Sequence, residues 1–152
     1  MSYKCVCAVD PGLTGAVAFY FPATDNVSVF DMPVAGGNVD CSTFNAMLDQ
    51  WRPDVSCVEQ VASRPGQGVS SMFKFGCGYG MVQGVIQARS IPLHLVTPQR
   101  WKKHFRLDSD KEKSRALALR FWPARSDLFG RKKDNGRAEA ALLAKFAAQM
   151  IV

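Results

Sequence analysis

Two carboxylates that close short apolar segments constrain this chain more than any other feature of its sequence. Asp10 follows the apolar residues 5–9, and Glu59 follows the largely apolar residues 55–58. Each segment has the character of a buried strand, where a lone ionised carboxylate is costly to bury. A charge at such a position normally has a partner or a metal. If the ends of these two strands lie close together, their carboxylates would therefore bind hard divalent cations.

The order of apolar segments and turns predicts an α/β fold with a five-stranded mixed sheet flanked by helices. Strands are expected at residues 4–10, 16–21 and 27–32, and their short connections predict an antiparallel arrangement. Two parallel strands are expected at residues 55–59 and 93–96, because a helix precedes each. The expected helices are a segment from the cap Ser42 to about Trp51, residues 70–89, a short segment capped by Thr97, a segment from the cap Asp110 to Phe121, and residues 137–150.

Length and composition fit one globular domain over residues 1–152. The chain has 152 residues, 47% of them hydrophobic and 21% charged, which is ordinary for a globular protein. Its apolar runs are too short to span a membrane, and its N-terminus lacks the layout of a signal peptide. Its five cysteines include no Cys-x-x-Cys pair, so we expect reduced thiols, with Cys5 and Cys7 packed in the core rather than bound to zinc.

Positive charge is concentrated in the last third of the sequence. Residues 98–137 hold thirteen Lys or Arg against five Asp or Glu, whereas the whole chain has a net charge of +6. A basic block joined to a near-neutral remainder suits a polyanion such as nucleic acid. A solubilising surface would give the same run of charges, but the position of this block just before the last acidic cluster favours a nucleic-acid partner.

Two motifs suggest nucleotide binding, and neither fits its context. The glycines between Gly76 and Gly84 resemble a dinucleotide fingerprint, but they lie inside a helical segment rather than between a strand and a helix. Close packing of that helix against the sheet or a second subunit explains them better. The turn from Asp10 to Thr14 also matches a pattern of two-lobed ATPases, and this chain has length for only one lobe.

A third acid, Glu139, lies on the apolar face of the last predicted helix. The helix is expected to bury Leu142, Leu143, Phe146 and Met150, and the spacing places Glu139 on the same face. A glutamate in the first turn is also stabilised by the helix dipole alone. With Asp10 and Glu59 at neighbouring strand ends, a shared metal site is the better interpretation.

The ordered set of motifs resembles the RuvC-type Holliday junction resolvases of the RNase H-like superfamily, above all their compact phage-type members. The matching segments are residues 8–15, 58–60, 65–68 with 76–84, 97–103, 110–115 and 136–140. They occur in the order of the family and cover nearly the whole chain.

The resemblance implies a set of catalytic acids that hold two Mg²⁺ ions, for which Mn²⁺ is expected to substitute. Asp10 and Glu59 match the strand acids of the family, and Glu139 matches its last helical acid. At the position of the fourth acid this chain has Gly136 and Asn135, so Asp134 is the expected ligand, with Asn135 as the alternative. Asp134 can reach the site only if the last helix begins at Gly136 or Arg137. Asp10 would bridge the ions, with Glu59 on one and the other two acids on the second.

The resemblance also implies residues that contact DNA and a homodimer with one site per subunit. Lys113, and with it Lys103, is expected at the scissile or a neighbouring phosphate. The remaining DNA contacts are expected from Arg64, Gln67, Arg100, Lys102, Lys111, Arg115, Lys132 and Lys133. The helix over residues 70–89 would supply the dimer contact. Where relatives carry an aromatic wedge this chain has Ala62, for which Phe73 or Phe75 could substitute, although both also fit a helix core.

The implied activity is metal-dependent resolution of four-way DNA junctions by paired symmetric nicks, in recombination and repair. The expected setting is the cytoplasm of a bacterial or phage-infected cell. A broader nuclease for flaps and other branched DNA would use the same residues. A non-catalytic junction-binding protein would not need Asp10 or Glu59, and an RNase H activity is possible on the same sheet.

Overall fold

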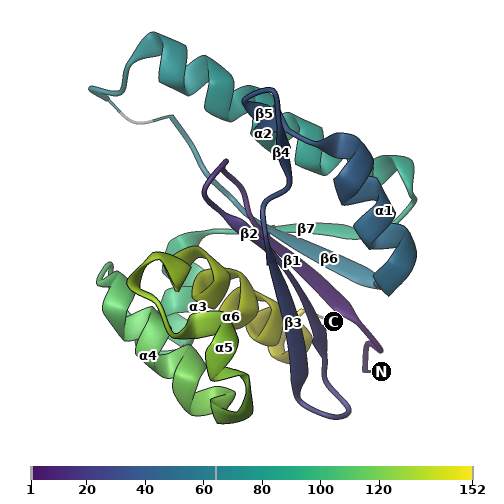
Figure 1. Ribbon diagram of the computed structural model, residues 1–152, viewed down its shortest axis with the longest axis vertical. Helices are drawn as coiled ribbons and strands as arrows, with labels where there is room; N and C mark the ends of the chain where they lie inside the picture. The colour runs from purple at the N-terminus through teal and green to yellow at the C-terminus, as the bar shows by residue number, and fades with distance from the viewer. Residues whose placement is uncertain (1, 64, 152) are drawn as a thin grey trace.

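The computed structural model describes residues 2–63 and 65–151. Its main feature is a five-stranded sheet in the order β3-β2-β1-β6-β7, placed between two groups of helices (Figure 1). The strands are β1 (Val6–Asp10), β2 (Ala16–Phe21), β3 (Asn26–Asp31), β6 (Val55–Glu59) and β7 (Leu93–Val96). β1, β2 and β3 pair antiparallel, whereas β6 pairs in parallel with both β1 and β7. The predicted mixed α/β sheet is confirmed.

Helices cover both faces of this sheet. One face carries α1 (Cys41–Trp51) and α2 (Val69–Ala88). The other carries α3 (Pro98–His104), α4 (Lys111–Phe121), α5 (Ser126–Phe129) and α6 (Asn135–Met150). A small hairpin of β4 (Val34–Ala35) and β5 (Asn38–Val39) lies beside α2, and two 3-10 turns, η1 (Pro123–Arg125) and η2 (Lys132–Asp134), connect the later helices. The sequence analysis did not anticipate the hairpin, α5 or these turns.

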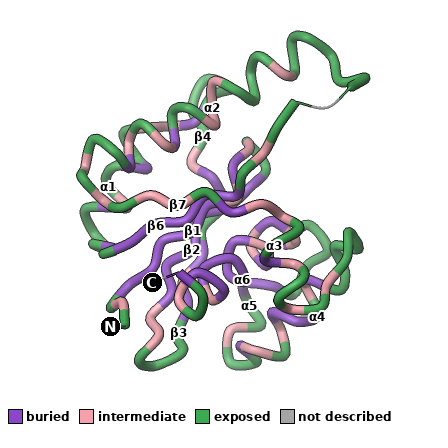
Figure 2. Tube along the Cα trace, turned by 180° about the vertical axis from the view of Figure 1, so that it is seen from behind, coloured by how far each residue is buried: buried purple, intermediate pink, exposed green. Residues whose placement is uncertain are grey.

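Strand alternation decides which core each side chain joins. Along β1, Val6 and Ala8 face the core that contains α6, whereas Cys7 and Val9 face the core beneath α1 and α2. Successive side chains of a strand point to opposite faces, so Asp10 continues the series of Val6 and Ala8. Burial is continuous through these central strands (Figure 2). Asp10, at the end of β1, therefore lies on the face of the sheet on which α6 packs.

The helix caps follow local side-chain chemistry. Thr97 caps α3 and Asp110 caps α4, each accepting a hydrogen bond from a backbone N–H of the first turn, as expected. The predicted cap Ser42 of helix α1 is wrong: Asp40 caps this helix, which begins at Cys41, because the Asp40 carboxylate accepts from the Thr43 N–H over 3.1 Å. Helix α6 begins at Asn135, two residues earlier than predicted.

All five cysteines are free, and Cys5 and Cys7 are buried in the core between the sheet and the helices α1 and α2. Burial raises the pKa of the Cys5 thiol to about 12. Within residues 2–63 and 65–151, no helix has the length and apolarity that crossing a membrane requires.

Candidate active site

Three carboxylates from three separate elements converge at one edge of the sheet. Asp10 ends β1, Glu59 ends β6 and Glu139 lies in the first turns of α6. One carboxylate oxygen of each lies within 4.8 Å of the others, close enough to hold a metal ion together. The structure thus brings together the three acids that the sequence singled out first.

The sheet and two glycines explain this convergence. β1 and β6 are parallel neighbours, so their carboxyl ends lie at the same edge. Helix α6 approaches that edge closely at Gly136, where an added Cβ would lie 3.0 Å from the carbonyl oxygen of Thr14 and 3.6 Å from Oδ2 of Asp10. At Gly15 an added Cβ would lie 1.9 Å from the Asp10 carbonyl oxygen. Both positions need glycine for α6 and the β1–β2 turn to pack beside Asp10.

The three carboxylates repel one another at a partly buried site. Burial raises the pKa of Asp10 well above its usual value, and the negative charges of Glu59 and Glu139 raise it further. The positive charges of Lys111 and Lys102 oppose this shift without cancelling it. Such a cluster is electrostatically incomplete without added positive charge, which a divalent cation would provide.

Glu59 is held by a tryptophan. Its carboxylate is 9% exposed, and its Oε2 accepts a hydrogen bond from Nε1 of the fully buried Trp101 over 2.8 Å. Trp101 lies on α3, which follows β7 directly. The indole N–H is a donor with no acceptor of its own, so it orients the carboxylate toward the sheet edge.

Two lysines face the acids across a cavity of about 480 Å³. Nζ of Lys102 lies 3.8 Å from Oε1 of Glu139, and Lys111 extends into the same cavity from the start of α4. Asn135 and Phe75 also line it. The same cavity is therefore lined by carboxylates, which suit a metal ion, and by lysine ammonium groups, which suit a phosphate bound to that ion.

Lys113 is not among the residues that line this cavity. Its ammonium pairs with the Asp108 carboxylate on the exposed side of α4. Lys111 and Lys113 are two positions apart, about 200° around a helix, so they cannot face the same site. The sequence analysis chose Lys113 for the phosphate and gave Lys111 a more peripheral DNA contact, whereas the structure places Lys111 beside the acids.

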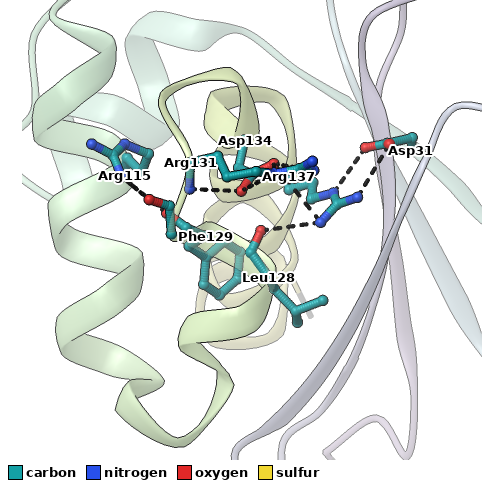
Figure 3. A network of polar contacts seen from close by, with 8 residues as sticks. Asp31, Arg115, Leu128, Phe129, Arg131, Asp134 and Arg137 are labelled. Carbon is teal, nitrogen blue, oxygen red and sulfur yellow. Dashed lines mark hydrogen bonds and ion pairs between the residues drawn. The ribbon is translucent and has the colours of Figure 1, made fainter.

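Asp134 is not brought to the three carboxylates either. It lies in η2, is 2% exposed, and accepts hydrogen bonds from the backbone N–H and the guanidinium of Arg131, both at 2.8 Å (Figure 3). Arg137 lies 3.8 Å away on its other side. Burial alone would raise the pKa of Asp134, but these arginine contacts outweigh it and lower that pKa. Because α6 begins at Asn135 rather than Gly136 or Arg137, the alternative residue Asn135 is the one that lines the cavity.

The structure places the other residues that were expected to contact DNA in different surroundings. Lys102 and Lys103 line a neighbouring cavity together with Arg106, and Gln67 lines another beside Glu59. Arg100 lies over the Phe146 ring, and Arg115 donates to the carbonyl oxygens of Phe129 and Gly130 and pairs with Glu112. Lys132 and Lys133 are exposed in η2, whereas Arg64 lies outside the described residues.

Sequence reasoning missed the role of Trp101. The available signal was its position four residues after the cap Thr97, which places it on the inner face of a helix that follows a strand end. The aromatic side chains of α2 also differ from a helix core, since Phe73 is 76% exposed and Phe75 is 36% exposed. Phe75 lies against the Glu59 side of the site, where it lines two cavities.

Comparison with solved structures gives matches over nearly the whole chain. The RuvC of T. thermophilus in complex with a Holliday junction substrate has a TM-score of 0.62 at 16% identity, covering 97% of this chain and 96% of that one. The fowlpox virus resolvase in complex with Holliday junction DNA has a TM-score of 0.58 at 13% identity, covering 97% and 99%. The yeast mitochondrial Holliday junction resolvase Ydc2 has a TM-score of 0.55 at 19% identity, covering 91% and 75%.

No protein-family profile and no curated protein matches the sequence. The similarity to these solved structures covers 91% to 97% of this chain, which contains the whole sheet and its flanking helices. The chain therefore has the RNase H-like fold of the RuvC-type Holliday junction resolvases.

Proposed function

We propose that this chain is a metal-dependent endodeoxyribonuclease that resolves four-way DNA junctions by paired, symmetric nicks. The observation that carries the proposal is the cluster of Asp10, Glu59 and Glu139, whose oxygens lie within 4.8 Å of one another beside Lys102 and Lys111. The fold supports the substrate, because the similar RuvC and fowlpox resolvase structures hold Holliday junction DNA.

The residues present fit a hard cation. All three acids offer oxygen ligands, which Mg²⁺ prefers, and the pKa of Asp10 is raised by burial and by the charges of the other two carboxylates, which a cation would offset. Asp10, Glu59 and Glu139 would hold the metal, with the Asn135 amide oxygen nearby. When bound, Mg²⁺ supplies charge neutralisation and an acidified water for phosphodiester hydrolysis. The number of ions, two by resemblance, and the use of Mn²⁺ remain predictions.

The basic side chains would orient the DNA. Lys102 and Lys111 would contact the phosphate that is cut, as fixed positive charges on the wall of the cavity. Lys103 and Arg106, on the adjoining cavity of about 720 Å³, would follow the backbone beyond it. Contacts of this kind position DNA without reading its sequence.

Paired nicking requires two sites, and we propose that α2 joins two copies of the chain. Val69 is 87% exposed and Phe73 is 76% exposed on this helix. Among the described residues, and leaving aside the neighbouring backbone of the helix itself, no atom lies within 4 Å of an added Cβ at Gly76, Gly80 or Gly84, so these glycines do not serve packing against the sheet. Of the two explanations for them, contact with a second subunit is the one that this exposure favours.

Cleavage of a mobile four-way junction, a flap and a linear duplex in Mg²⁺ tests the proposal. We expect selective, symmetric cleavage of the junction that is lost on chelation. Asp10→Asn should abolish nicking and retain junction binding, whereas Asp49→Asn, which changes an exposed carboxylate on α1, should cleave normally. Equal cutting of flaps would instead identify a broader branched-DNA nuclease, and an RNA–DNA hybrid would reveal RNase H activity. Binding without cleavage would mean a non-catalytic protein.

A further inference from the structure

We propose that Lys102 competes with the metal ion for Glu139 and binds a DNA phosphate instead when the ion is present, an inference that rests on the proposed function. Nζ of Lys102, on α3, lies 3.8 Å from Oε1 of Glu139, on α6. Glu139 is also one of the three acids whose oxygens lie within 4.8 Å of one another. The same carboxylate thus serves two cations, an ammonium of the chain and a divalent ion.

The ion pair between Lys102 and Glu139 is enclosed but not tightly fixed. The two side chains are 20% and 12% exposed, so water screens their attraction only in part. Their separation of 3.8 Å exceeds the roughly 2.7–2.9 Å of a hydrogen bond between an ammonium and a carboxylate. The pair is therefore held by charge, without the short directional bond that would resist exchange for another ion.

Lys102 would be repelled by a divalent ion bound to Glu139. Two positive charges a few ångströms apart repel strongly in a partly buried site, because such a site screens them less than bulk water does. The charge of Lys102 already acts on the group of acids, since it opposes the raised pKa of Asp10. Lys102 and the ion therefore neutralise the same negative charge, and each weakens the binding of the other.

Lys102 has a second position available once it leaves Glu139. It lines the cavity of the three acids and also the adjoining cavity of about 720 Å³, together with Lys103 and Arg106. Its flexible four-carbon stem allows the ammonium to turn between the two cavities without movement of α3. At the boundary of these cavities the ammonium would meet the phosphate that is cut. Release from Glu139 therefore makes a positive charge available to the substrate.

This exchange would couple metal binding to DNA binding. Lys102 cannot neutralise Glu139 and a phosphate fully at the same time, so a metal ion on Glu139 favours the phosphate contact. By thermodynamic linkage, a phosphate that holds Lys102 away from Glu139 favours the metal ion to the same extent. The site would thus bind its metal most tightly when DNA is present.

Binding of Mn²⁺ to the DNA-free protein, measured by electron paramagnetic resonance of the unbound ion, tests this inference without cleavage. Lys102→Met keeps most of the side-chain volume and removes the competing charge. We expect it to bind Mn²⁺ about tenfold more tightly than the wild type, since a unit charge at this range has an effect of that size. Lys103→Met, the matched control on the same helix, removes an exposed charge of the adjoining cavity and should change Mn²⁺ affinity by about twofold at most.

The same variant should nevertheless lose activity. At saturating Mn²⁺, Lys102→Met should cleave a junction about tenfold more slowly in a single turnover, because the phosphate loses a positive contact. A substitution that merely damaged the site would weaken Mn²⁺ binding as well. Tighter metal binding combined with slower cleavage is therefore the signature of the exchange.

Three outcomes would contradict the inference. Mn²⁺ affinity of Lys102→Met that equals or falls below that of the wild type would overturn it while leaving the nuclease intact. Tightening of the same size in a Glu139→Gln background would also overturn it, because the effect would then not depend on the ion pair. If the wild type neither binds Mn²⁺ nor cleaves a junction, the proposed function fails and the inference fails with it.

Discussion

The indole of Trp101 donates its Nε1 hydrogen to Oε2 of Glu59 over 2.8 Å, wholly inside the core. Because the donor is fully buried, it fixes the direction of the carboxylate. Hydrogen bonds to charged groups are worth more than neutral ones, roughly 1.5–3 kcal/mol. Trp101 is therefore a positioning residue for the acidic site.

Trp101→Phe keeps the aromatic ring and removes the N–H donor. We expect the Mg²⁺ concentration that gives half-maximal cleavage to rise about tenfold, because Glu59 is no longer held toward the other acids. A Mg²⁺ titration of junction cleavage measures this directly. Trp122→Phe is the matched control, since the buried Trp122 donates a partly buried indole hydrogen bond of 2.9 Å to the Asp25 carbonyl, away from the site. A lower Tm in both variants with no change in Mg²⁺ requirement would contradict the assignment.

Lys111 and Lys113 form a natural pair of variants on one helix. Lys111→Met removes a positive charge from the wall of the acidic cavity, whereas Lys113→Met removes an exposed partner of Asp108. We expect Lys111→Met to slow single-turnover cleavage by about tenfold or more, and Lys113→Met to change it by about twofold at most. The opposite ranking would restore Lys113 as the residue that acts on the phosphate.

The raised pKa of Asp10 predicts how the stability of the metal-free chain depends on pH. Above the usual value of 3.8, the folded chain keeps a proton on Asp10 that the unfolded chain has released. The free energy of unfolding therefore falls as the pH rises through this window, up to the folded-state pKa. Asp10→Asn cannot ionise, so its Tm in chelator should decline less with pH and exceed that of the wild type at neutral pH.

Thermal unfolding between about pH 5 and about pH 8 checks this expectation. Asp49→Asn, an exposed carboxylate outside the site, should follow the wild-type curve. Added Mg²⁺ should stabilise the wild type most at the upper end of the range and stabilise Asp10→Asn much less. If Tm depended on pH in the same way for the wild type and Asp10→Asn, ionisation of Asp10 would not destabilise the folded state, contrary to the prediction.

The sheet and the three acids of the site could be predicted, because their positions depend on local sequence patterns. Asp10 and Glu59 each end a short apolar run that predicts a buried strand, and helical spacing predicts Glu139 on the apolar face of the last helix. Lys111 and Asp134 could not be assigned in this way. Their positions depend on where a helix begins, since one residue of shift turns a side chain by about 100°. The 3-10 turn η2, which sets the start of α6, has no sequence signal comparable to Thr97 or Asp110 at the other caps.

Asp134 and Asn135 are neighbours with different expected roles. Asp134→Asn weakens the contacts to Arg131 and Arg137, so the free energy of unfolding should fall by roughly 1.5–3 kcal/mol, while the Mg²⁺ requirement stays the same. Because those contacts lower the pKa of Asp134, the stability it contributes should also be lost as the pH falls toward that pKa. Asn135→Ala should instead leave Tm nearly unchanged and raise the Mg²⁺ needed for cleavage. If Asp134→Asn instead raised the Mg²⁺ needed for cleavage, and Asn135→Ala lowered Tm, Asp134 would be the metal ligand.

The exposed face of α2 gives the last prediction. If two copies join through this helix, the 16.7 kDa chain should sediment as a dimer, and Phe73→Glu should convert it to a monomer by placing a charge in the interface. The monomer should still nick junctions but lose simultaneous cutting of both strands, which a supercoiled cruciform plasmid reports as nicked rather than linear product. Met150→Glu, on the opposite layer and 47% exposed, should remain dimeric. Paired cutting by a chain that sediments as a monomer with or without DNA would exclude this arrangement.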